Sequence, residues 1–338
     1  MRMQRSLLAL TVLLTATCAS RAQDVAAFYA GKTIRLAVGV DVGSGYDLNA
    51  RLLARHMGRH IPGNPAFIVQ NQPGAGSATM TSQLNASGPF DGTTIGAAFA
   101  GMPTIPLLQP GSSRFDPTKL IWLGNTNRET HVTYVWHAAP VQSLAEAMTT
   151  ELIMGAQAPG SSQVDFPLVA DALLGFKFKI VAGYQSTPKI NLALESGEVQ
   201  GTIAAWTTLK TLSSAWLADG KIKIIAQWAL RRNPELDVPN MLDLAKTQAE
   251  RDALRLVMAR LDIGRPFFLP PNVPPDRVAA LRAAFDATMK DPDYLAEADG
   301  LKIDVDPLTG TELAALVAQV SQTPAETIAR VRAALERK

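Results

Sequence analysis

The chain has 338 residues, of which 47% are hydrophobic and 18% are charged, and its formal net charge is +2. This composition allows a large apolar core and argues against a disordered chain, and the length suggests about two domains. Lysine and arginine are scattered along the chain rather than clustered, so no nucleic-acid partner is indicated.

The first 22 residues have the layout of a secretory signal peptide. Arg2 and Arg5 precede an apolar stretch over residues 7–14, and a small-x-small cleavage pattern ends at Ala22. The apolar stretch is shorter than the roughly 20 residues that a membrane span needs. Removing the three arginines of this segment lowers Lys plus Arg from 32 to 29 against 30 acidic residues, a net charge of −1. We therefore expect a periplasmic protein, and because Cys18 is the only cysteine, one without disulfides or thiolate chemistry.

Short β-rich runs then alternate with helical stretches. Strands are predicted over 32–40, 66–72 and 93–99, with helices over 46–60 and 77–85 between them. The same rhythm returns after residue 150, with strands over 151–157, 177–184, 199–206 and 221–229 and helices over 162–174 and 189–196. This alternation predicts βαβ units on mostly parallel sheets, arranged as two α/β lobes flanked by helices.

Two segments are candidate crossings between the lobes. Residues 126–137 are β-branched and aromatic without a helical period, and residues 263–275 contain prolines that exclude a central helix. The remainder is helical, with capping signals at Thr309, Thr311 and Thr323. Two crossings return the tail to the first lobe, which we expect to hold residues 24–128 plus 263–338, with residues 129–262 forming the second.

The stretch VDVGSGYD, residues 40–47, is a glycine-rich turn from a strand into a helix. Such a turn points backbone N–H groups at whatever lies above the sheet edge, which favours an anion. Leu48 stands where a dinucleotide fingerprint needs its third glycine, and no phosphate-loop Gly-Lys-Ser/Thr triplet follows, so nucleotides are disfavoured. The turn could also be only a tight bend capped by Asp47. A second such turn, residues 71–80, is expected at the same edge of the sheet.

Three ordered motifs together resemble a known family. KTIRLAVGVDVGSGYDLNAR, PAFIVQNQPGAGS and GPFDGTTIGAA are similar in wording and spacing to the extracytoplasmic receptors of tripartite tricarboxylate transporters, also called Bug-type solute-binding proteins. The segment RPFFLPPNVPPDRVAALRAAFDATMKDP also looks like that family. The matching positions are Gly43, Gly45, Asp47, Ala50, Arg51, Asn71, Pro73, Gly74, Ala75, Gly76, Asp91, Gly92 and Thr94.

The resemblance implies a type II periplasmic-binding-protein fold with hinge strands between its lobes. It also implies a non-enzymatic receptor that closes on a small organic acid and delivers it to membrane permease subunits. We expect no cofactor, and a monomer is the default for a shuttle that must visit a membrane partner. Asp41 departs from the family's wording, since it stands where an apolar or small residue is usual, and Tyr46 replaces a commonly small residue. Asp41 is either a solvated loop acid or a group that repels a fully anionic ligand or accepts an amine or hydroxyl.

The expected site combines loops of both lobes. Backbone N–H groups of residues 43–46 would hold one carboxylate, Ser161 and Ser162 the other end, and Asp47 would order the first loop or reach a ligand hydroxyl through water. For the serines the alternative is helix capping alone, and for Tyr184 and Trp206 it is burial in the lobe core. The full set of predicted ligand-binding residues is Asp41, Val42, Gly43, Ser44, Gly45, Tyr46, Asp47, Gly101, Gln157, Pro159, Gly160, Ser161, Ser162, Tyr184, Gln185 and Trp206.

Catalysis finds no support in the motifs. No Gly-x-Ser-x-Gly occurs, and the four histidines have no evident serine partner. His56 and His60 are four apart, which is metal-ligand spacing, but HMGRH lacks the glutamate of the zinc protease motif. Two alternatives remain open: a metal-binding or metal-dependent periplasmic protein that uses His56 and His60, and a ligand sensor for a two-component system.

Overall fold

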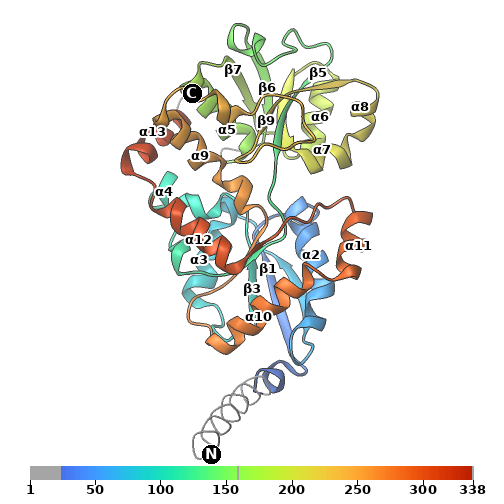
Figure 1. Cartoon of the computed structure of the whole chain (residues 1–338), viewed down its shortest axis with the longest axis vertical. Coiled ribbons are helices and arrows are strands. Elements are labelled where there is room, and N and C mark those ends of the chain that lie inside the picture. Colours follow the sequence, from blue (N-terminus) through green and yellow to red (C-terminus); the bar gives the residue numbers. More distant parts are fainter. Residues whose placement is uncertain (1–23, 158–159, 337–338) are drawn as a thin grey trace, which may run out of the picture.

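The computed structural model describes residues 24–157 and 160–336. The predicted signal peptide, residues 1–22, and Pro159 of the predicted site lie outside these ranges. The described chain forms two α/β lobes stacked along the long axis of the molecule (Figure 1). Within the described ranges, no helix has both the length and the apolar character that crossing a membrane requires.

The first lobe is built on a sheet of six strands in the order β11-β4-β10-β3-β1-β2. Strand β1 pairs in parallel with β2 and β3, whereas β10 and β11 run antiparallel to their neighbours. The strands of this sheet are β1 (Thr33–Val38), β2 (Ala66–Asn71), β3 (Thr94–Ala97), β4 (Ile121–Asn125), β10 (Pro266–Leu269) and β11 (Leu308–Thr309).

Both faces of this sheet are covered by apolar packing. Adjacent strand residues point to opposite faces, so Phe267 joins the apolar core on one side while Phe268 joins the core on the other. This explains why β10 reads as a continuous apolar run. The helices that provide the covering side chains are α2 (Gly45–Met57), α3 (Ala78–Ser87), α4 (Ile105–Leu108), α10 (Pro275–Thr288), α11 (Pro292–Gly300) and α12 (Gly310–Ser321).

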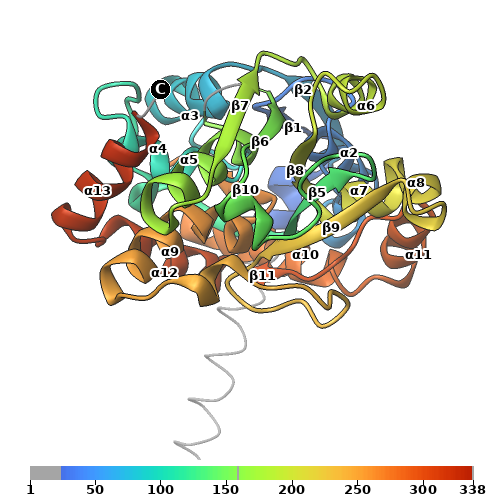
Figure 2. The same cartoon turned by 90° about the horizontal axis from the view of Figure 1, so that it is seen from above.

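The second lobe has a five-stranded sheet in the order β7-β6-β8-β5-β9. Figure 2, which looks down on this lobe, shows α5, α9 and α13 on one side of the sheet and α6, α7 and α8 on the other. Its strands are β5 (His131–Trp136), β6 (Leu152–Ala156), β7 (Phe178–Ala182), β8 (Gly201–Ala205) and β9 (Ile222–Trp228). Its helices are α5 (Ser162–Leu174), α6 (Thr187–Glu195), α7 (Trp206–Leu212), α8 (Ser214–Ala218), α9 (Gln248–Ile263) and α13 (Ala325–Leu335).

The two predicted crossings are confirmed, and they explain why each sheet is mixed. The chain passes from β4 to β5 through residues 126–130 and returns between α9 and β10 at Gly264 and Arg265. Strands β5 and β10 therefore enter their sheets from the side that faces the other lobe, and both run antiparallel to their neighbours. The carboxyl ends of the parallel strands consequently face the other lobe, which is where ligands bind in open α/β sheets.

The carboxyl-terminal helices differ from the expected assignment of residues 263–338 to the first lobe. Helix α12 packs against β4 as expected, but α13 packs against α9 and α5 (Figure 1). Val331 and Ala334 of α13 are buried in the apolar core of the second lobe. The physical reason is the break at Thr323 and Pro324, which ends α12 and starts a new helix whose apolar stripe faces the other lobe. A third chain crossing therefore lies at residues 322–324.

Candidate ligand site between the lobes

The loop before α2 is ordered by Asp47, which is only 1% exposed. Its carboxylate accepts hydrogen bonds from Gly43 N (2.8 Å), Arg51 Nε (3.0 Å) and Asn71 Nδ2 (2.9 Å), and its own N–H donates to the N-cap Ser44 Oγ (3.2 Å). Burial favours protonation, but the hydrogen bonds from Arg51, Gly43 and Asn71 outweigh it and lower the pKa of Asp47. These contacts hold Asp47 to the protein itself. The motif residues Asp47, Arg51 and Asn71 form one hydrogen-bonded network.

The backbone of residues 43–46 does not line the interlobe cavity of about 410 Å³ that is described below. Gly43 N is bonded to Asp47, and Gly43 and Gly45 line a smaller cavity of about 160 Å³ together with Thr207 and Arg265. A Cβ added to Gly45 would come within 3.1 Å of the Arg265 guanidinium, so the glycine permits that close approach. Val42 is 70% exposed. The structure therefore does not bring these predicted N–H donors together with the residues of the larger cavity described below.

Tyr46 packs in the interior near the hinge. Its ring centroid lies 4.6 Å from the Arg265 guanidinium carbon and 5.4 Å from the ring centroid of Phe99, and its hydroxyl accepts from Ala100 N (3.3 Å). Burial raises the pKa of the Tyr46 hydroxyl, which stays neutral. Tyr46 therefore covers a buried arginine, a role that a smaller residue in its place would not fill.

Arg265 is held by a buried ion pair that joins the two hinge segments. Its Nη2 donates to Glu129 Oε1 (2.6 Å), and Glu129 Oε2 lies 3.1 Å from His131 Nε2. Burial raises the pKa of Glu129, but Arg265 and His131 lower it more strongly, to about 2. Glu129 stands on the first crossing and Arg265 on the second, so this pair ties the hinge strands to one another.

The second glycine-rich turn adopts a backbone that side chains rarely accept. Ala75, Gly76 and Ser77 all have positive φ, at 46°, 59° and 72°, a region that costs non-glycine residues roughly 1–2 kcal/mol each. Ser77 is fully buried, and its Oγ donates to Gly39 O (3.0 Å) and accepts from Phe99 N (2.9 Å). This hydroxyl links the ends of β1 and β3 to the turn and holds the strained backbone in place.

The opposing loop of the second lobe is ordered by a buried ion pair that the sequence analysis missed. Arg260 of α9 and Asp165 of α5 are paired at 2.7 Å, with side chains 5% and 7% exposed. Arg260 Nη1 donates to Gly160 O (2.8 Å), and Gly160 N donates to Asp165 Oδ1 (3.1 Å). Gly160, two residues before α5, is therefore held by both partners of the ion pair. The available signal was Arg260, the second of two arginines in the mostly apolar stretch LRLVMARLDI.

These two turns face one another across a cavity of about 410 Å³, a size typical of small-ligand sites. Gly39, the turn at residues 73–76 and Ala78 line it from the first lobe, whereas Arg260 and Asp165 line it from the second. Five of the predicted site residues also line this cavity: Asp41, Gly101, Gln157, Gly160 and Ser161.

Two polar atoms in this cavity wall lack a hydrogen-bond partner among the described residues. They are Ser161 Oγ and Arg260 Nε, both shielded from solvent. Ser161 is the N-cap residue of α5, yet its side chain makes no capping hydrogen bond. Buried polar groups are normally paired, which singles out these two atoms among the residues that line the cavity.

No protein-family model and no curated protein matches the chain. Solved structures do match: a TctC solute binding protein from Polaromonas is 20% identical, with a TM-score of 0.67 over 90% of this chain and 98% of that one. The periplasmic binding protein BugD is 20% identical, with a TM-score of 0.68 over 90% of this chain and 98% of its own. MatC from Rhodopseudomonas palustris, with bound malate, is 20% identical at a TM-score of 0.65, over 90% and 99%.

The chain has the fold of a periplasmic binding protein. The fold predicted from the sequence is confirmed, and the matching structures carry names of the receptor group that the three motifs resemble. The cavity of about 410 Å³ lies between the two lobes of this fold, at the carboxyl edges of both sheets.

The other described residues that were predicted to bind the ligand do not line the 410 Å³ cavity. Ser162 is the first residue of α5, and Gln185 is exposed. Tyr184 donates to Glu198 Oε1 (2.6 Å), and burial, with help from this contact, raises the pKa of Tyr184 to about 12. Trp206 donates from Nε1 to Glu235 Oε2 (2.7 Å) and lines a different cavity. The loop at residues 183–187 was expected at the ligand because it follows a strand, but none of these residues lines the 410 Å³ cavity.

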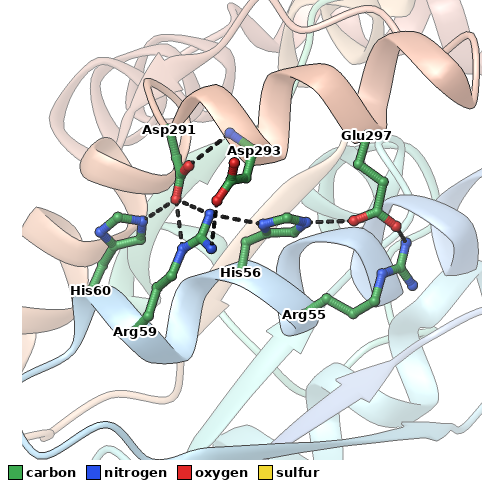
Figure 3. Close-up of polar contacts among 7 residues, drawn as sticks. All are labelled: Arg55, His56, Arg59, His60, Asp291, Asp293 and Glu297. Carbon is green, nitrogen blue, oxygen red and sulfur yellow. Dashed lines mark hydrogen bonds and ion pairs between the residues drawn. The ribbon is translucent and has the colours of Figure 1, made fainter.

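The histidine pair of the metal-binding alternative contacts carboxylates instead. His56 Nε2 lies 2.5 Å from Glu297 Oε2 of α11, and His60 Nε2 lies 2.6 Å from Oδ2 of Asp291, the N-cap residue of α11 (Figure 3). Arg59 lies between them and contacts His56 Nδ1 (3.1 Å) and Asp293 (3.0 Å). Across the described ranges, no group of three or more potential metal ligands is brought together. These contacts fasten α11 to α2.

Proposed function

We propose that the protein is an extracytoplasmic solute receptor that captures a small organic acid between its lobes. The supporting observation is the interlobe cavity of about 410 Å³, whose wall carries the unpartnered Ser161 Oγ and Arg260 Nε. Among the structures of similar fold, MatC is described with malate and a second R. palustris protein with adipate. Binding and release are the whole of the proposed activity, without a catalytic step or a cofactor.

The magnitudes favour a ligand held by both lobes. A micromolar dissociation constant corresponds to about −8 kcal/mol, whereas the end of helix α5 contributes only ~0.3–2 kcal/mol to an anion. Charge-assisted hydrogen bonds of roughly 1.5–3 kcal/mol each, from groups such as Ser161 and Arg260, must provide most of the remainder. Water expelled from the apolar part of the wall adds to this and offsets the entropy of association.

A matched pair of serine variants tests the placement of the ligand. Ser161 lines the cavity, whereas Ser162 does not, and the two residues are adjacent in the chain. We expect Ser161→Ala to weaken binding of a carboxylate found by thermal-shift screening at least tenfold, the equivalent of about 1.4 kcal/mol, and Ser162→Ala to change it less than twofold. Equal effects of the two variants, or none from Ser161→Ala, would mean that the carboxylate binds elsewhere.

We further propose that the receptor works in the periplasm as a monomer and delivers its ligand to the permease of a tripartite tricarboxylate-type transporter. The sequence motifs support this partner. A cell lacking the receptor gene should lose uptake of the radiolabelled acid and regain it when the gene is restored. If uptake is kept and only the transcriptional response to the acid is lost, the protein is a sensor for a two-component system.

A further inference from the structure

The part of the cavity wall that the described residues form carries an excess of negative charge. Its ionisable side chains are Arg260, Asp165 and Asp41. Arg260 and Asp165 are buried and paired at 2.7 Å, so their charges cancel. Asp41 is exposed at the end of the strand-to-helix loop and, within the described residues, no ion pair to its carboxylate is found. One positive and two negative charges leave the wall with a net charge of −1.

Arg260, the cation of the wall, already uses part of its guanidinium group for contacts within the protein. Both Nη atoms of Arg260 are engaged, with Gly160 O and Asp165 Oδ2, and only Nε is left without a partner. Ser161 Oγ is a second unpartnered donor among the described residues that line the cavity. Two donors suit one carboxylate group. Within residues 24–157 and 160–336, neither lobe contributes a second cation to the wall.

The rest of the wall is largely apolar. Phe99 follows β3, Ile105 and Leu108 belong to α4, and Leu335 is the last residue of α13, and all four line the cavity. Apolar side chains favour a hydrocarbon body and penalise a second ionised group that they would strip of water. The amide of Gln109 and the hydroxyls of Thr104 and Ser112 are neutral.

We propose that the ligand carries a single carboxylate on an apolar body, and that Asp41 selects against dicarboxylates and tricarboxylates. The carboxylate binds at Ser161 Oγ and Arg260 Nε, and the body packs against Phe99, Leu108 and Leu335. A second carboxylate on the ligand would face Asp41 or the apolar wall without a free cation. This inference rests on the proposed receptor function and narrows its ligand class, and it separates this chain from the structures of similar fold described with malate and adipate.

The test compares acids of equal length. Calorimetric titration of the purified protein with butyrate against succinate, hexanoate against adipate, octanoate against suberate and 4-methylbenzoate against terephthalate isolates the second carboxylate. We expect the best monocarboxylate to bind at least tenfold more tightly than its dicarboxylate partner. Asp41→Asn should reduce that ratio at least threefold. Asp237→Asn removes an equally negative residue that is fully exposed and does not line the cavity, and it should leave the ratio unchanged.

The outcomes distinguish a failure of the inference from a failure of the proposed receptor function. A dicarboxylate that binds as tightly as its monocarboxylate partner, or an Asp41→Asn variant with an unchanged ratio, overturns the inference and leaves the receptor function standing. If no acid in the series binds, both the receptor function for organic acids and the inference that rests on it are refuted.

Discussion

The buried pair of Glu129 and Arg265 should be a principal stabilising contact of the hinge. Their side chains are 6% and 8% exposed, so replacing Glu129 by glutamine leaves a largely buried guanidinium charge without its partner. Breaking a buried pair from one side costs about 3–5 kcal/mol. The fall in the pKa of Glu129 from 4.5 to about 2 corresponds to about 3 kcal/mol. The two figures agree.

The lowered pKa of Glu129 determines how the stabilisation by this pair should change with pH. Because the pKa of Glu129 is lowered in the folded state, its contribution is present above the unfolded value of 4.5 and is lost as the pH falls towards about 2. Urea unfolding should therefore show Glu129→Gln less stable than wild type by about 3–5 kcal/mol at pH 7. The gap should shrink between pH 5 and pH 2.5.

A double variant is the control for this pair. Changing Arg265 to methionine together with Glu129→Gln removes both charges and keeps an apolar chain under the Tyr46 ring, so most of the lost stability should return. A single variant within about 1 kcal/mol of wild type at pH 7, or a gap that does not change with pH, would show that the pair is solvated or not formed and would refute the reasoning.

Two further predictions concern other contacts. Ser77→Ala should lower the free energy of unfolding by about 2 kcal/mol, because it leaves Gly39 O and Phe99 N unpaired in the interior. Ser87→Ala, at an exposed position, is the control in the same melts. An equal loss of stability in both variants would contradict a special role for Ser77. Zinc titration by calorimetry should give the same weak isotherm for wild type and His60→Ala, since His60 and His56 contact different carboxylates. Tight zinc binding that His60→Ala abolishes would restore the metal-binding alternative.

The sequence was sufficient for the fold because its signals are local. The strand and helix rhythm, the proline-rich return segment and the capping threonine Thr309 each follow from the chemistry of neighbouring residues, and the structure contains the elements they predict. The exchange of α13 to the second lobe was not predictable in this way. It depends on which surface covers Val331 and Ala334, and that surface is made by helices far away in the sequence.

The candidate site was predicted less completely, for a related reason. Sequence reasoning identified Asp41, Gly101, Gln157, Gly160 and Ser161, which line the cavity. It treated the N–H groups of residues 43–46 as free, whereas Asp47 already accepts from Gly43. Arg260 lies 95 residues from its partner Asp165, and no local pattern announces a pair at that separation.

The position of α13 has a practical consequence for handling the protein. Leu335 is part of the cavity wall, and only three residues of the 338 follow it. An affinity tag added after residue 338 therefore starts three residues beyond a residue of the cavity wall. The imidazoles of a polyhistidine tag bind metal ions and attract anions, so such a tag would imitate both metal binding and acid binding. A removable tag at the other end of the chain keeps such artefacts out of every titration described above.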